Sequence, residues 1–112
     1  NTVYSGHDMT AHAELNLIHA MSALNLGDSL EGVSLYTSTE PCIMCSGAIY
    51  WAGIAHVIYG CSETGLAKYS SGDFLSPCRE TFAKGTRGIS VVGPVLQADG
   101  EAIHADYWGT GW

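Results

Sequence analysis

The chain has 112 residues and a formal net charge of −7 at neutral pH; 46% of its residues are hydrophobic and only 13% are charged. This length suits a single domain spanning residues 1–112, and no apolar run approaches the roughly 18 residues of a membrane span. So acidic a chain is not expected to bind nucleic acid or a membrane surface, because both need a basic footprint.

The first third of the chain carries one helix signal and one strand signal. Apolar residues recur at helical spacing through residues 12–25, which predicts a helix. Thr10 would cap this helix and Gly27 would stop it. Residues 33–37, "VSLYT", alternate apolar and polar side chains, as a strand with one buried face does.

A second helix and a second strand follow. Pro41 suits the first position of a helix that runs through "CIMCSGAIYWAG" and ends at Gly53. Residues 55–60, "AHVIYG", then predict another strand.

The remaining elements are less regular. Residues 61–87 indicate a loop with short helical pieces, one of them around 77–84. Residues 89–93 predict a third strand that Pro94 would end, and residues 99–109 predict a last helix. Helices and strands that alternate at this spacing predict an α/β layered domain.

Two cysteines, Cys42 and Cys45, lie at the start of the helix that follows Pro41. Residues three apart in a helix are neighbours, so both sulfur atoms can reach one ion. The positive end of the helix dipole favours their thiolate forms. Zinc in proteins takes four ligands, so two thiolates are only part of a site.

His12 is the best third ligand, and Glu14 follows it closely. A catalytic zinc has three protein ligands and an open position for water, and a carboxylate beside it can move protons. Positions i and i+2 do not share a face inside a helix, so His12 and Glu14 converge only if the metal lies off the helix's first turn. We therefore expect two helices that start side by side.

The alternative is a structural zinc or a redox pair. A structural zinc would need a fourth protein ligand, available from Cys61, Cys78, His7, His19, His56 and His104. None of these has motif spacing. We interpret His19 as a packed or partly exposed side chain, and Cys61 and Cys78 as buried thiols.

The segments "TAHAE" and "STEPCIMCSGAIYWAG", with their H-x-E and P-C-x-x-C spacing, resemble the zinc-dependent nucleobase and nucleoside deaminases of the cytidine deaminase-like superfamily. The resemblance runs from Asn1 to about residue 75. It implies a three-layer α/β/α fold with a mixed central sheet. It also places a helix and two strands before the His-x-Glu helix, so we expect this chain to lack that N-terminal part.

The resemblance also implies roles for single residues. One zinc ion would be bound by His12, Cys42 and Cys45, with water or hydroxide as the fourth ligand. Glu14 would shuttle protons between this water, a ring nitrogen and the leaving ammonia. Asn1, eleven residues before His12, would hydrogen-bond the base, unless it is only a turn residue, and Ala13 would also contact the substrate.

Within the superfamily, "GAIYWA" is most similar to bacterial-type guanine deaminases, which implies guanine as the substrate. Asp73 stands 28 residues after Cys45, where those enzymes carry a second proton relay, although "SGD" also suits a plain turn. Trp51 would wall the base pocket, or else pack in the core. Aromatic residues near the C-terminus would close the pocket: Tyr107, Trp108 and Trp112.

Competing substrates are cytosine, another small aminated heterocycle or nucleoside, and tRNA adenosine. The last is disfavoured because the chain has only four Lys and Arg residues, none of them after Arg87. The low content of charged residues favours a homodimer or larger homo-oligomer. We expect a cytoplasmic enzyme that acts on a small molecule, and no signal peptide is visible within the sequence.

Overall fold

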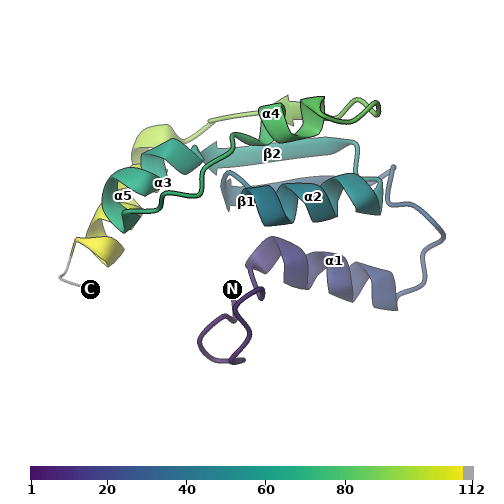
Figure 1. Cartoon of the computed structure of the whole chain (residues 1–112), viewed down its shortest axis with the longest axis horizontal. Coiled ribbons are helices and arrows are strands. Elements are labelled where there is room, and N and C mark those ends of the chain that lie inside the picture. Colours follow the sequence, from purple (N-terminus) through teal and green to yellow (C-terminus); the bar gives the residue numbers. More distant parts are fainter. Residues whose placement is uncertain (110–112) are drawn as a thin grey trace.

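A small parallel sheet organises the chain in the computed structural model, which describes residues 1–109 (Figure 1). The elements are α1 (Ala13–Ala23), β1 (Ser34–Thr39), α2 (Ile43–Ala52), β2 (His56–Cys61), α3 (Glu63–Ser70), α4 (Cys78–Ala83), β3 (Ser90–Val92) and α5 (Gln97–Trp108). Helix α1 lies against α2, and α3 lies against α5 at one end of the sheet. No helix of this described part is long and apolar enough to cross a bilayer.

The sheet has the order β1-β2-β3, and both pairings are parallel. The α/β class is therefore confirmed, whereas the mixed sheet that the resemblance implies is not seen among the described strands. Side chains alternate between the two faces of a strand. Leu35 and Val57, partners in the register, are buried on one face, while Tyr36 on the opposite face is 74% exposed.

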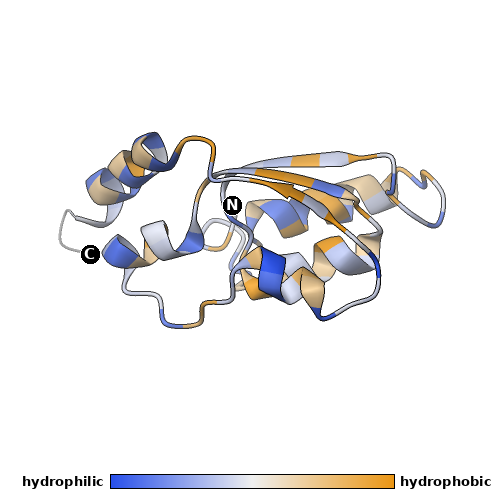
Figure 2. Ribbon diagram, turned by 90° about the horizontal axis from the view of Figure 1, so that it is seen from above, coloured by the Kyte–Doolittle hydropathy of each residue, from blue (hydrophilic) through white to orange (hydrophobic). Residues whose placement is uncertain are grey.

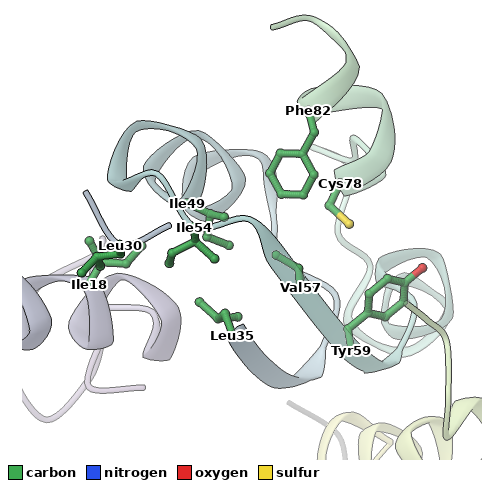
Figure 3. Packing of buried hydrophobic residues seen from close by; sticks show 9 residues of the cluster. All are labelled: Ile18, Leu30, Leu35, Ile49, Ile54, Val57, Tyr59, Cys78 and Phe82. Carbon is green, nitrogen blue, oxygen red and sulfur yellow. The ribbon is translucent and has the colours of Figure 1, made fainter. Parts of the chain in front are cut away.

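The hydrophobic core fills the space between the sheet, α1, α2 and α4 (Figure 3). Its buried members are Ile18, Leu30, Leu35, Ile49, Ile54, Val57, Tyr59, Cys78 and Phe82. Figure 2 shows the matching pattern in the ribbon, with apolar residues gathered along the strands. Burying each large apolar side chain contributes about 1.5–3 kcal/mol, so this cluster fixes the position of α2 on the sheet.

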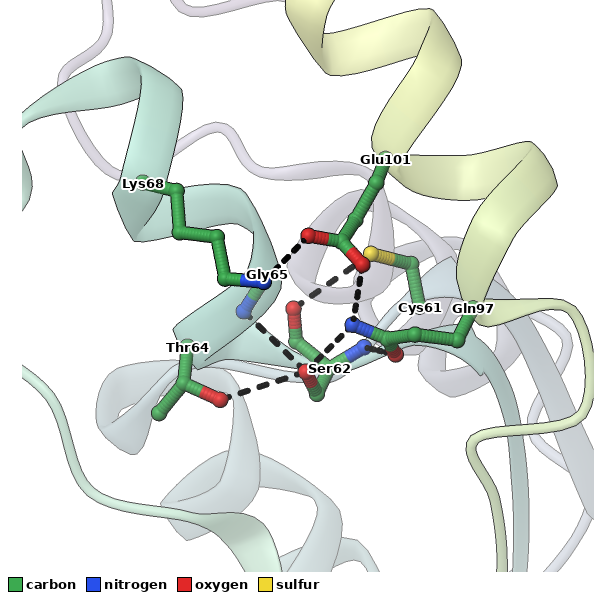
Figure 4. A network of polar contacts seen from close by, with 7 residues as sticks. All are labelled: Cys61, Ser62, Thr64, Gly65, Lys68, Gln97 and Glu101. Carbon is green, nitrogen blue, oxygen red and sulfur yellow. Dashed lines mark hydrogen bonds and ion pairs between the residues drawn. The ribbon is translucent and has the colours of Figure 1, made fainter.

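A polar network joins α3 to α5 (Figure 4). Gln97 Oε1 accepts a hydrogen bond from the Ser62 N–H at 2.8 Å, and Lys68 Nζ lies 2.8 Å from Glu101 Oε1. A side chain at Gly100 would overlap Cys61, so α5 packs closely on the end of β2. The last helix is thereby held at the carboxyl end of the sheet.

Several predicted boundaries shift by a few residues. Thr10 does not cap α1: its hydroxyl donates to Asp8 at 2.7 Å, and His12 is the N-cap. Pro41 precedes the N-cap Cys42 instead of starting α2. Gly53 ends α2 as predicted, in the left-handed conformation with φ 84° that glycine adopts without strain.

Candidate metal centre

Three metal-binding side chains meet where α1 and α2 begin. His12 is the N-cap of α1, Cys42 is the N-cap of α2, and Cys45 lies in the first turn of α2. His12 Nδ1 lies 3.5 Å from Cys42 Sγ and 3.6 Å from Cys45 Sγ. The two helices therefore start side by side, as the His-x-Glu spacing predicted.

The donor set fits zinc. Tetrahedral zinc with bonds of about 2.3 Å to sulfur and about 2.0–2.1 Å to nitrogen separates sulfur and nitrogen ligands by about 3.6 Å. The two observed sulfur–nitrogen distances match this value. No fourth His, Cys, Asp or Glu joins this group within residues 1–109, so the structural-zinc alternative has no additional protein ligand there. The arrangement corresponds to a site with three protein ligands and one open position.

Hydrogen bonds at the start of α2 favour the thiolate form of Cys42, which can bind a cation. The pKa of Cys42 is lowered to about 5, first because the Cys45 thiol donates to it and then because backbone N–H groups of Cys45 and Met44 point at it. The pKa of Cys45 is raised because it donates that hydrogen bond and is buried. Binding a metal ion requires the thiolate forms and displaces the shared proton.

Glu14 lies beside the cysteines without joining the ligand group. Burial raises the pKa of its carboxyl, and the charge of Cys42 raises it further. A raised carboxyl pKa brings the group closer to neutral pH, where it can both accept and donate a proton. Its environment therefore suits a proton carrier.

The other predicted contacts lie at differing distances from this centre. The backbone N–H of Thr2 donates to Ala11 O at 2.9 Å, which brings the N-terminal residues next to His12. The Asn1 side chain accepts the Val3 N–H at 3.0 Å, and Ala13 is exposed at the start of α1.

The remaining predicted contacts lie on α2, on α5 and in the loop of residues 71–77. Trp51 is 85% exposed near the far end of α2 and packs edge-on against Tyr50, and the structure does not bring it to the metal centre. Asp73 is exposed in the 71–77 loop. Tyr107 and Trp108 pack edge-to-face at the end of α5, with ring centroids 4.9 Å apart, and Trp112 lies outside the described residues.

Two buried carboxyl groups next to the site were not predicted. Glu40, one residue before Pro41, is 7% exposed, and Glu63, at the start of α3, is 5% exposed. Desolvation, followed by the charge of Glu40, raises the pKa of Glu63 to about 7. The sequence carries little signal for Glu40, because β1 before it reads "SLYTST" and a charged residue at the end of so polar a strand is ordinarily exposed.

Glu63 makes a pH-dependent contribution to stability that can be measured. Its folded pKa of about 7 lies above the ordinary 4.5, so its contribution is fully present below pH 4.5 and is lost as the pH rises through about 7. Glu63→Gln keeps the shape without the charge. From pH 5 to 8.5, the free energy of unfolding of the wild type should fall by on the order of 1–3 kcal/mol more than that of the variant, measured with urea.

Glu80→Gln is the control for this comparison, because the side chain of Glu80 is exposed. It removes one carboxylate at a solvated position and should follow the wild type at both pH values. Equal pH dependence in the wild type and in Glu63→Gln would contradict the assignment.

The fold and the metal centre together define a class of protein: an α/β domain with a three-ligand zinc site and an adjacent carboxylate. Residues 1–61 match the family described as the cytidine and deoxycytidylate deaminase zinc-binding region. The chain belongs to this family. Its zinc-binding region therefore includes the group formed by His12, Cys42 and Cys45.

Its relatives are named for different substrates. A probable cytosine deaminase of Schizosaccharomyces pombe is 36% identical over 109 residues, covering 93% of this chain and 66% of its own. The guanine deaminase of Bacillus subtilis is 43% identical over 68 residues, covering 61% and 44%. A tRNA-specific adenosine deaminase of Buchnera aphidicola is 33% identical over 101 residues, covering 88% and 59%.

Solved structures agree with the fold. NE0047 in complex with 2,6-diaminopurine superposes with a TM-score of 0.79 at 25% identity, over 100% of this chain and 62% of that one. The chain thus spans roughly half to two thirds of the length of the proteins it matches.

Proposed function

We propose that this chain carries the catalytic site of a hydrolytic nucleobase deaminase, with guanine as the preferred substrate and xanthine and ammonia as products. One observation carries the proposal: Glu14 lies beside a three-ligand zinc group with no fourth protein ligand among the described residues. This is the arrangement that hydrolysis needs, because water can occupy the open position.

The chain's own residues supply the proton transfers. Bound zinc makes water reactive at neutral pH. Glu14 accepts the proton that this water loses and delivers it to a ring nitrogen of the base. It then takes the remaining proton from the oxygen added to the ring carbon and passes it to the amino group, which departs as ammonia when the carbon–nitrogen bond breaks. His12, Cys42 and Cys45 hold the metal, and the starts of α1 and α2 fix their orientation.

Guanine is favoured over other bases by the similarity to a guanine deaminase around the cysteine helix and by the position of Asp73, which would relay a proton to the exocyclic amine. Cytosine is the second candidate, because the probable cytosine deaminase matches along 93% of the chain. tRNA adenosine is less favoured, since the net charge of −7 opposes an RNA backbone.

The remaining substrate contacts belong to the same proposal. Asn1 and Ala13 would border the base, because both lie close to His12 in the chain or in space. Tyr107 and Trp108 would close the pocket, either in their own subunit or in a neighbour of a homodimer. Trp51, which is 85% exposed, suits a subunit contact better than a pocket wall. We place the enzyme in the cytoplasm.

Ammonia release from a panel of bases tests the substrate. The zinc-loaded protein should release ammonia from guanine and give xanthine, with lower kcat/KM for guanosine, adenine, cytosine and cytidine. Activity on cytosine with none on guanine would overturn the guanine assignment. No release from any base would overturn the proposed function.

A further inference from the structure

Glu40 is a buried carboxylate without a cationic partner among residues 1–109. Its Oε1 accepts the backbone N–H of Glu63 at 2.9 Å, and its Oε2 accepts the backbone N–H of Cys78 at 2.7 Å. These amides belong to the first residues of α3 and α4. Hydrogen bonds to an ionised carboxylate are about twice as strong as neutral ones, and helix N-termini favour negative charge.

The two amides are the ends of one segment, which we call the 63–78 arch. It consists of α3 and the loop of residues 71–77, and it ends at Cys78. The side chain of Glu40 therefore binds both ends of the arch, which we call its feet. At its tip, Phe74 is 75% exposed, Leu75 is 42% exposed and Asp73 is also exposed. Because both ends of the arch are fixed, the exposed apolar side chains of its tip can form one wall of a site for a flat, partly apolar ligand.

The feet stand beside the metal centre. Glu40 is two residues before the ligand Cys42, and its own N–H donates to Cys61 O at 2.7 Å. Thr39 and Cys61 are partners in the register, so β1 and β2 end side by side, about 5 Å apart. In Figure 1 the connection between α3 and α4 passes the end of the sheet where α2 begins. Ligands of parallel α/β sheets bind outside this carboxyl edge.

We propose that Glu40 is a positioning residue, which holds the 63–78 arch beside the metal centre so that the tip of the arch covers a bound base. The proposal rests on the proposed deaminase function. Glu40 touches neither the ion nor the base, and it acts through the two amides. Loss of the two hydrogen bonds to Glu40 should weaken the binding of the base, while the metal ligands and Glu14 stay in place.

Glu40→Gln tests this, because an amide side chain has one acceptor oxygen and cannot serve both backbone N–H groups. Amide hydrogen exchange within residues 63–78 should become about tenfold faster or more. KM for the base should rise about tenfold, while kcat stays within about threefold and zinc remains at one ion per chain. Glu80→Gln, an exposed carboxylate in the first turn of α4, is the matched control and should change none of these.

A second pair of variants covers the case in which Glu40→Gln does not fold. Glu63→Pro removes the N–H that binds Oε1, at the first position of α3, which proline favours. Ser62 is already extended, with ψ 153°, as a residue before proline must be. Glu63→Ala lacks the same carboxyl but keeps the N–H. Faster exchange in the arch and a higher KM for Glu63→Pro than for Glu63→Ala would support the proposal.

Equal exchange and equal KM in these two variants would overturn it. Loss of zinc from Glu40→Gln with unchanged hydrogen exchange in the arch would also overturn it, because Glu40 would then act only on the segment that carries Cys42. A wild-type protein that deaminates no base would remove the proposed function, but hydrogen exchange needs no substrate. The exchange result would still decide whether Glu40 holds the arch.

Discussion

Glu14→Gln should lower kcat for deamination by at least about a thousandfold while zinc stays bound. Removing one general acid–base group typically costs a factor of about 10²–10⁴, and Glu14 is expected to act in more than one proton transfer. Glutamine keeps the size of the side chain and one acceptor oxygen but cannot carry the proton. The raised pKa of Glu14 reflects burial first and the Cys42 charge next, and both effects depend on its place beside the metal ligands.

The measurement is single-turnover ammonia release, with zinc quantified in the same sample. Glu31→Gln is the control, because Glu31 is exposed between α1 and β1. It should keep full activity and full zinc. A Glu14→Gln protein that remains fully active would show that another group moves the protons. Inactivity together with loss of zinc would show that Glu14 contributes to metal binding instead.

Cys45→Ala should abolish stoichiometric zinc binding and lower the melting temperature. Cys45 is completely buried, and removal of one of three protein ligands leaves a two-ligand site. An ion present at a thousand times its Kd stabilises the folded state by about 4 kcal/mol. In a domain of this size that corresponds to a shift on the order of 10 °C or more.

Calorimetric melting with and without added zinc measures this effect. Addition of zinc should raise the melting temperature of the apo wild type and leave that of Cys45→Ala unchanged. Cys61→Ala is the control, because Cys61 is an equally buried thiol outside the ligand group. It should lose some stability through its cavity but keep the response to zinc. A zinc response in Cys45→Ala equal to that of the wild type would contradict the ligand assignment.

The metal centre was predictable because its determinants are local. Cys42 and Cys45 are fixed relative to each other by one turn of α2, and His12 and Glu14 by the first turn of α1. Only the meeting of the two helices depends on the whole fold, and the i, i+2 spacing already required a metal off the helix end. The strands were also predictable to within about two residues, since each alternates or clusters apolar side chains.

Helix α3 and the carboxylate Glu40 were harder to predict. The segment "ETGLAKYS" contains a glycine and little apolar periodicity, and it is helical because Ser62 caps its first turn and the network with α5 holds it. The two amides that bind Glu40 are 15 residues apart, so only the folded chain shows that they converge. Substrate contacts were least predictable, because they depend on loops and chain ends that no periodicity describes.

The N-cap of α1 has a consequence for the evolution of the chain. His12 makes no side-chain hydrogen bond to the first turn of the helix that it begins. Serine or aspartate there would satisfy a free backbone amide and add about 1 kcal/mol to helix stability. Selection for stability alone would therefore replace His12, whereas metal binding requires the imidazole. The helix that carries the site thus retains a suboptimal N-cap, a local trade of stability for metal binding.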